Sequence, residues 1–305
     1  MAIKTIKYKN ITWHHIDEVN KDALDFLKSN YRFHPLDLGD VAAEIGESKI
    51  DIYKNYFFLI LCFPILNRAS GRIDLMEMDI FCGPDYLVTV QKGKYKAMRD
   101  LYYRLQNNTK NRQSFFGENS GYLLYRVLDV LYRDAKFINS YIARKARELE
   151  DEVYNEDSNK ETAREIAYLR KKILSLKRIY APQDEVATAL TKLKVSFLPE
   201  DLNNYFDDID DQIDKVLNFL ENQKSAMKDL LEVYDSLMNH ATNKVIKILT
   251  VISVGMLPLT LLSGIYGMNI DLPWANSPSL VLGMFVFLLL FILLVMYIFK
   301  RKKLL

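Results

Sequence analysis

Two long apolar stretches near the C-terminal end constrain this chain more than any other feature. The first runs from Ile248 to about Met268 and the second from about Leu280 to Phe299. Each has roughly 20 residues, which is the helix length needed to cross the hydrocarbon core of a bilayer. A soluble core helix rarely runs so far without a polar stripe. The sequence therefore predicts two transmembrane helices, at 248–268 and 280–299, and argues against a wholly soluble enzyme.

The distribution of charge predicts how these helices are oriented. The 305 residues include 41 Lys and Arg against 39 Asp and Glu, a balance that gives no argument for nucleic-acid binding. Between Ile248 and Phe299 the only charged residue is Asp271, and four basic residues, 300–303, follow at once. By the positive-inside rule the basic tail 300–305 stays in the cytoplasm, as do Lys244 and Lys247 before the first span. Both termini are then cytoplasmic, and the loop 269–279 lies outside the inner, or plasma, membrane.

The two predicted spans differ in composition. The second is almost uniformly apolar, as suits contact with lipid. The first contains Thr250, Ser253, Gly255, Pro258, Thr260, Ser263 and Gly264. Small and hydroxylated residues inside a membrane helix indicate either close helix packing or a water-filled lining, and the residues alone leave both readings open.

The part before the spans is typical of a soluble α/β domain, which we assign to residues 1–199. Apolar runs broken by turn residues predict a small antiparallel meander over Phe57–Leu66 and Ile73–Gln91. Cys62 and Cys82 are too few for a disulfide scaffold or a cysteine-based zinc cluster. Helices are predicted near 22–30 and 94–105, then over 122–156 and 160–180, with a further short helix delimited by Pro182 and Pro199.

A single long helix is predicted after Pro199, because no proline or glycine follows before Gly255. Its cytosolic part, 200–247, runs into the first span without a breaker. Such a stalk with a heptad seam needs a partner, either other helices of the same chain or copies of itself, and self-association would bring several first spans together. The seam residues recur at steps of three and four, with Gln223 filling the one gap, and are Phe206, Ile209, Ile213, Val216, Leu220, Met227, Leu230, Tyr234, Leu237 and Ala241.

The segment Gly264-Ile-Tyr-Gly-Met-Asn269 stands at the outer end of the first span, before a short loop and one last helix with a basic tail. This arrangement resembles the CorA family of divalent-cation channels, whose signature is Tyr-Gly-Met-Asn. The likeness extends to 242–250, Pro258-Leu-Thr260, Phe33-His-Pro-Leu36 and Tyr122-Leu-Leu-Tyr125. It implies an α+β cytosolic domain, a long stalk helix and two transmembrane helices, assembled in membrane lipid as a funnel-shaped homopentamer. It also implies Mg²⁺ influx, with Co²⁺ or other divalent cations as further cargo, and no partner beyond further copies.

The resemblance assigns roles along the first span. Gly267, Met268 and Asn269 would form the selectivity filter. A circle of amide oxygens suits hydrated Mg²⁺, because this ion gives up its water reluctantly. The alternative is that Gly267 and Asn269 only end the helix. The pore would continue through Asn243, Thr250 and Thr260, with a hydrophobic gate at Ile246, Leu249 and Leu257; for these gate residues plain helix packing is the alternative.

Three acidic residues are implied as cytosolic regulators. In the family, carboxylates at the positions of Asp40 and Asp208 come from neighbouring subunits and share a regulatory Mg²⁺, and Asp129 matches a further acidic position nearby. Loss of that ion would favour opening. Gly39 departs from the family pattern, in which an acidic residue often stands there, so a second metal is not supported. The loop 270–278 also departs, leaving Asp271 as its only acid.

Other functions remain as alternatives. A zinc, cobalt or nickel carrier of the same fold is one, although the intact Gly267-Met-Asn269 favours magnesium, since the zinc branch typically changes the middle residue. A non-conducting, membrane-anchored coiled-coil scaffold is another. An enzyme is disfavoured because the sequence has no Gly-rich phosphate loop and no set of nucleophile and base.

Overall fold

The computed structural model describes residues 3–67, 71–93, 95–155, 160–269 and 277–301. Contacts divide the chain into two units, residues 1–231 and 232–305, which are described separately. The predicted turn at 155–159 falls mostly outside the described residues, as does most of the loop 269–279.

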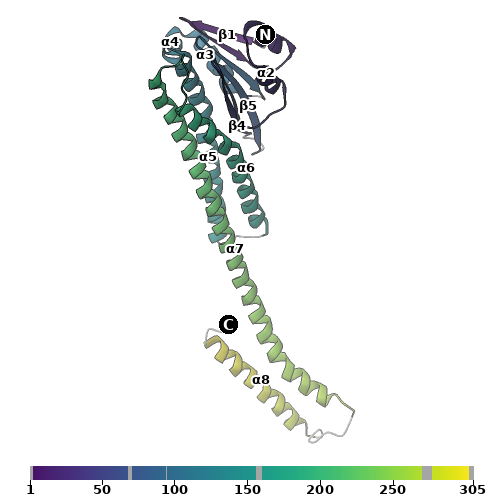
Figure 1. Cartoon of the computed structure of the whole chain (residues 1–305). Coiled ribbons are helices and arrows are strands. Elements are labelled where there is room, and N and C mark those ends of the chain that lie inside the picture. Colours follow the sequence, from purple (N-terminus) through teal and green to yellow (C-terminus); the bar gives the residue numbers. More distant parts are fainter. Residues whose placement is uncertain (1–2, 68–70, 94, 156–159, 270–276, 302–305) are drawn as a thin grey trace. The chain divides into compact units, whose positions relative to one another are not determined.

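The first unit is built on a six-stranded sheet in the order β1-β2-β6-β5-β4-β3 (Figure 1). All neighbouring strands are antiparallel except β2 and β6, which are parallel. The predicted meander is confirmed as β4, β5 and β6. The strands are β1 (Ile3–Tyr8), β2 (Ile11–Ile16), β3 (Lys49–Ile52), β4 (Phe57–Leu66), β5 (Ile73–Cys82) and β6 (Tyr86–Lys92).

Helices cover both faces of the sheet, which explains why β4 is apolar on both sides. On one face Phe58 and Ile60 share a core with Val41 of α2 (Pro35–Ala42) and Leu27 of α1 (Lys21–Asn30). On the other face the ring of Phe63 meets Tyr132 of α5 (Ser120–Tyr154) edge-on, with centroids 5.1 Å apart. The helix α6 (Lys160–Thr191) also packs against β4. The remaining helices of this unit are α3 (Lys96–Asn107), α4 (Thr109–Phe116) and the 3₁₀ turn η1 (Glu200–Leu202).

Local signals in the sequence account for the helix starts. Asn20 Oδ1 accepts the Ala23 N–H at 2.9 Å at the start of α1, and Asn119 Oδ1 accepts the Tyr122 N–H at 2.8 Å at the start of α5. The prediction of a separate short helix after Pro182 is wrong, because α6 passes through that residue. Burial of Tyr180 and Val186 on either side outweighs the backbone hydrogen bond that proline removes.

The helix α7 (Asn203–Tyr266) is continuous over 64 residues. The absence of proline and glycine predicts this up to Gly255, and the helix then also passes through Pro258. The heptad seam is buried from Phe206 to Tyr234, but Leu237 is 37% exposed and Ala241 is exposed. Thr188 Oγ1 donates to Asp210 Oδ1 at 3.2 Å, and Lys177 pairs with Glu221 at 2.5 Å, so α6 is one partner of the seam. Helices of the same chain therefore cover the first part of the stalk.

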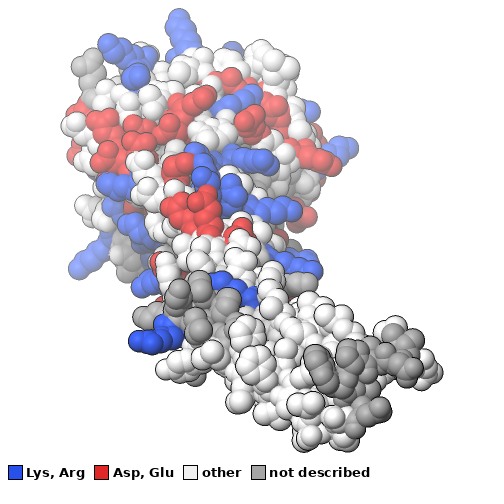
Figure 2. All heavy atoms as spheres, turned by 90° about the horizontal axis from the view of Figure 1, so that it is seen from below, with Lys and Arg blue, Asp and Glu red and all other residues white. Residues whose placement is uncertain are grey.

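The second unit is a pair of apolar helices, the C-terminal part of α7 and α8 (Pro278–Arg301). Within the described residues, α7 contains one stretch long and apolar enough to cross a membrane, and α8 is apolar over Pro278–Leu294. The Tyr266 hydroxyl donates to Met284 Sδ at 3.7 Å, linking the two helices. Figure 2 shows a part of the molecular surface that is almost entirely white, whereas blue Lys and Arg and red Asp and Glu side chains are scattered over the rest.

Candidate functional site

One face of α7 carries every residue predicted to line or gate the pore. At about 100° per residue, the six side chains fall within about 120° of arc around the helix axis. All six are exposed in the single chain. They are Asn243, Ile246, Leu249, Thr250, Leu257 and Thr260.

The opposite face of α7 packs against α8. The half-buried residues of α7 beyond position 241 lie about 180° around the axis from the six. Tyr266 bonds to Met284 directly, and at Gly255 the two helices come so close that an added Cβ would lie 3.2 Å from Ile292 Cγ2. The α8 contact therefore leaves the face with the polar residues uncovered. The half-buried set is Val251, Gly255, Pro258, Leu259, Leu262 and Tyr266.

Two further residues lie on this face, which the sequence analysis counted among the small and hydroxylated residues of the first span without giving them a pore role. Ser253 and Gly264 continue the same line at steps of three and four, and both are exposed. No atom outside the local backbone lies within 4 Å of a Cβ placed on Gly264. The signal that would have found them is their spacing, three from Thr250 and four from Thr260, together with their small or hydroxylated side chains.

The threonine hydroxyls on this face direct their hydrogens back into the helix. Thr250 Oγ1 donates to the Ile246 carbonyl at 2.8 Å, and Thr260 Oγ1 donates to the Met256 carbonyl at 3.0 Å. Each hydroxyl oxygen keeps its acceptor capacity. The exposed face therefore presents acceptors rather than donors at these two positions.

The Gly267-Met-Asn269 segment lies just beyond the end of α7. The Gly267 N–H bonds to the Ser263 carbonyl at 2.9 Å, and the Met268 N–H bonds to the Ile265 carbonyl at 3.2 Å, which caps the last turn. A Cβ on Gly267 would stand 3.1 Å from the Ser263 carbonyl oxygen, so the close turn favours glycine. Asn269 is exposed. Helix capping and an exposed amide are thus both present at this end.

Asp40 is held in place near the end of α2. The buried Asp37 accepts hydrogen bonds from the hydroxyls of Tyr53 and Tyr56, each at 2.7 Å, and so fastens α2 to the sheet. Partial burial and the Asp37 carboxylate together raise the pKa of Tyr53 to about 12. The Asp40 carboxylate itself pairs with Lys49, with Oδ2 2.8 Å from Nζ.

Asp208 and Asp129 lie near one another around Tyr125. The Tyr125 hydroxyl donates to Asp208 Oδ2 at 3.4 Å, and Asp129 pairs with Arg133 at 2.9 Å. Burial, then Asp208, then Asp129 raise the pKa of Tyr125. Asp208 Oδ2 also accepts from Gln212 at 3.0 Å. These carboxylates supply the oxygen ligands that Mg²⁺ prefers.

One chain does not bring Asp40 and Asp208 together. Asp40 belongs to α2, on one face of the sheet, whereas Asp208 belongs to α7, which packs with α5 and α6 on the other face (Figure 1). Among the described residues no group of three or more His, Cys, Asp or Glu side chains is arranged to hold a metal ion. A metal shared by Asp40 and Asp208 therefore requires two subunits.

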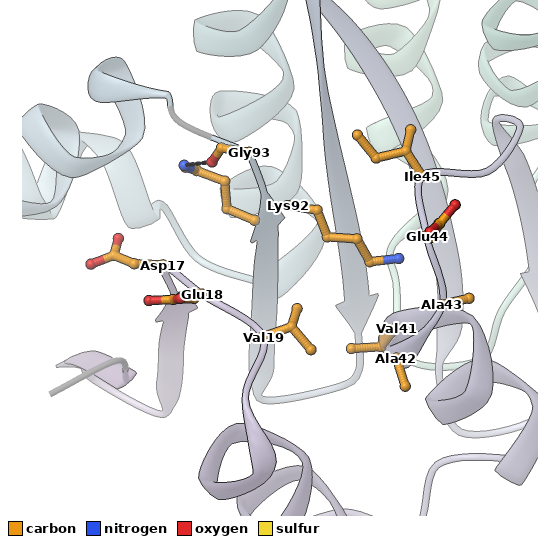
Figure 3. Close-up of a pocket in the computed structure, with 11 residues that line it drawn as sticks. Asp17, Glu18, Val19, Val41, Ala42, Ala43, Glu44, Ile45, Lys92 and Gly93 are labelled. Carbon is orange, nitrogen blue, oxygen red and sulfur yellow. Dashed lines mark hydrogen bonds between the residues drawn. The ribbon is translucent and has the colours of Figure 1, made fainter.

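A pocket of about 840 Å³ opens beside the end of α2, lined by residues 17–19, 41–45 and 91–93 (Figure 3). The ammonium group of Lys92, which lines this pocket, already has partners. It pairs with the buried Glu77, lies 3.3 Å from Asp79 and donates a hydrogen bond to the Asp40 carbonyl at 2.7 Å. Asp79 is fully buried, and burial, followed by the charge of Glu77, raises its pKa well above the ordinary value. The lysine that lines this pocket is thus held by buried acidic partners that lie outside the lining.

Replacing Asp79 with asparagine is expected to stabilise the protein at neutral pH. Because the folded state holds the Asp79 proton more tightly than the unfolded state, stability falls as pH rises above about 4 and stays low above the raised pKa. Asp79→Asn removes this loss. We expect its unfolding midpoint at pH 7.5 to exceed that of the wild type by about 2–4 °C, and the gap to shrink towards pH 4. A variant less stable at every pH would contradict this assignment.

The chain as a whole matches a known family. A family model described as CorA-like Mg²⁺ transporter protein matches residues 8–301. The chain belongs to the CorA family. Members of this family are ion transporters and channels, so the chain is a divalent-cation transporter of the membrane and not an enzyme.

Relatives within the CorA family align with nearly the whole chain, but the transported metals in their names differ. The chain is 26% identical over 298 residues to the cobalt/magnesium transport protein CorA of Thermotoga maritima, covering 96% of this chain and 83% of the relative. It is 23% identical over 285 residues to the zinc transport protein ZntB of Yersinia enterocolitica, covering 93% and 84%. The complete structure of the CorA magnesium transporter from Methanocaldococcus jannaschii superposes with a TM-score of 0.81 at 21% identity, covering 97% and 92%. The expected fold, an α+β domain followed by a long helix and apolar C-terminal helices, is confirmed.

Proposed function

We propose that this protein is a homo-oligomeric Mg²⁺ channel whose pore is lined by the uncovered face of α7. The observation that carries the proposal is the division of α7 into two faces. One face packs on α8, whereas the other is exposed in the single chain and carries Asn243, Thr250, Ser253 and Thr260. Polar groups inside a membrane normally face a helix bundle or water rather than lipid. Copies of α7 packed around an axis would provide that environment.

The chemistry of this face suits a hydrated divalent cation. Water bound to Mg²⁺ points its hydrogens outward, so the hydrated ion is recognised by hydrogen-bond acceptors. The hydroxyls of Thr250 and Thr260 are acceptors of this kind, because their own hydrogens are bonded within the helix. Neutral acceptors also bind weakly enough to release the ion, which conduction requires.

The narrow filter in this proposal is the Gly267-Met-Asn269 segment. Five copies, the number that the family resemblance implies, would place five Asn269 amides around the outer mouth. In this scheme Gly267 allows the close turn that ends α7 just before Asn269. Ile246, Leu249 and Leu257 form the hydrophobic gate in the same scheme, since apolar constrictions close by losing water.

Influx needs no nucleotide site under this proposal. With the cytoplasm negative, an entering divalent ion gains about 4.6 kcal/mol per 100 mV, which is twice the value for a single charge. Both termini are assigned to the cytoplasm, on the basis of Lys244, Lys247 and the basic residues 300–303.

Regulation is assigned to cytosolic Mg²⁺ bound between subunits. Asp40 and Asp208 supply the ligands from neighbouring copies, and Asp129 adds a carboxylate close to Asp208. Facing carboxylates repel one another when the site is empty, and a bridging divalent ion holds them together. A fall in cytosolic Mg²⁺ would release the interface and favour opening.

Magnesium is preferred to zinc as the main cargo for a chemical reason. Residues 241–269 contain neither histidine nor cysteine, the ligands that zinc favours. The polar side chains of the proposed lining and filter, Asn243, Thr250, Ser253, Thr260 and Asn269, offer oxygen atoms. In liposomes with a negative-inside potential we expect uptake of Mg²⁺, with Co²⁺ as a competing cargo and Zn²⁺ at least about fivefold slower at equal activity. Zinc uptake faster than magnesium uptake would favour the zinc carrier, whereas no uptake of any metal would favour the scaffold.

A further inference from the structure

Asp40 is contacted by two lysine ammonium groups. Lys49 Nζ lies 2.8 Å from its Oδ2, and Lys92 Nζ donates to its backbone carbonyl at 2.7 Å. The Lys92 charge is shared with the buried Glu77 and Asp79. The Lys49 ammonium instead forms an ion pair with the Asp40 carboxylate, the group that the proposed function assigns to a regulatory metal.

Lys49 is also held from other directions. Its ammonium is 2.7 Å from Asp51 Oδ2 and 5.9 Å from the centre of the Phe58 ring. Lys49 and Asp51 are two residues apart on β3, so both side chains lie on the sheet face covered by α2. Partial burial by itself would lower the pKa of Lys49, but the hydrogen bonds to Asp40 and Asp51 outweigh it and raise the pKa. The group is therefore a fixed cation at physiological pH.

We propose that Lys49 is an internal cation that competes with Mg²⁺ for the Asp40 carboxylate and so sets the Mg²⁺ concentration at which the subunit interface closes. This inference rests on the proposed regulatory role of Asp40. A divalent ion reaching Asp40 must displace the ammonium or bind beside it against like-charge repulsion. Asp51 gives the displaced ammonium an alternative partner, which makes the exchange reversible.

The geometry leaves room for the exchange. The side chains of Lys49 and Asp40 are 42% and 37% exposed, so the ion pair is open to solvent and to a neighbouring subunit. Exposed ion pairs are weak, typically contributing no more than about 1 kcal/mol. A pair of this kind raises the metal concentration needed without preventing binding.

The test measures Mg²⁺ binding to the full-length protein in detergent, stripped of metal beforehand. Protection against proteinase K and the heat of Mg²⁺ binding are followed as Mg²⁺ is added; trypsin is unsuitable because it cleaves at lysine. The variants are Lys49→Met, which keeps the apolar stem but removes the charge, and Lys49→Gln as a second neutral variant. Lys49→Arg, which keeps the charge, is the matched control.

We expect half-maximal protection at about two- to fivefold lower Mg²⁺ in Lys49→Met and Lys49→Gln than in the wild type or Lys49→Arg. An unchanged or higher requirement in both neutral variants would overturn the proposal. Asp40→Asn and Asp208→Ala separate this inference from the function on which it rests. If these two lose protection while the neutral Lys49 variants match the wild type, only the role of Lys49 fails. If Mg²⁺ protects none of the proteins, the regulatory role of Asp40 fails with it.

Discussion

Replacing Asn269 with alanine is expected to lower Mg²⁺ influx at least tenfold while leaving the fold unchanged. In the proposed channel each subunit contributes one amide oxygen to the outer mouth, and a methyl group cannot accept a hydrogen bond from the water around the ion. A site built for hydrogen bonding discriminates strongly when the partner group is lost. Because Asn269 is exposed in the single chain, its truncation removes little packing.

The measurement is Mg²⁺ uptake by purified protein in liposomes under a fixed negative-inside potential. Asn107→Ala, an exposed asparagine at the end of α3 in the first unit, is the matched control and should conduct like the wild type. Equal uptake by Asn269→Ala and the wild type would defeat the filter assignment and leave Gly267 and Asn269 as a helix cap.

Replacing Gly264 with leucine is expected to block influx almost completely. Gly264 lies on the uncovered face of α7, and nothing in the single chain lies within 4 Å of a Cβ added there, so leucine can be accommodated by the isolated subunit. If copies of α7 surround a pore, that face is crowded near the axis, and one bulky apolar side chain per subunit both narrows and dewets the passage.

Gly283→Leu provides a matched control for this substitution. Gly283 lies on α8 and also has nothing within 4 Å of its Cβ position, but α8 is the almost uniformly apolar helix suited to lipid. Assembly, judged by size-exclusion chromatography, should survive in Gly283→Leu together with uptake. Comparable uptake by both assembled variants would place Gly264 away from the passage.

Much of the fold followed from local signals in the sequence. The apolar lengths predicted both C-terminal helices, and the lack of proline and glycine between Pro199 and Gly255 predicted the unbroken cytosolic part of α7. Strands β1, β2 and β3 were not predicted, because they are short and carry polar residues at buried or half-buried positions, such as Lys4, His15 and Asp51. The parallel pairing of β2 with β6 depends on contacts between residues far apart in the chain, which no local pattern encodes.

Part of the candidate sites could likewise be predicted from local spacing in the sequence, and part depends on contacts between distant segments. The residues of the α7 face share one helix, so their spacing alone places them on one side. The ion pair between Asp40 and Lys49 joins α2 to β3 and became evident only from the folded chain. Proline at 182 misled the sequence prediction because the tertiary packing of α6 outweighs a local preference.

The most direct test of the lining compares two adjacent cysteines in α7. Ser253 and Ile252 are neighbours at the same depth and are both exposed in one chain, but they point about 100° apart, with Ser253 on the proposed lining. The native Cys62 and Cys82 are buried and should not interfere. In Ser253→Cys, thiolates from several subunits would converge on the ion path, and micromolar Cd²⁺ should inhibit Mg²⁺ uptake. Ile252→Cys should be insensitive to Cd²⁺. Inhibition of Ile252→Cys but not of Ser253→Cys would mean that the other side of the helix lines the pore.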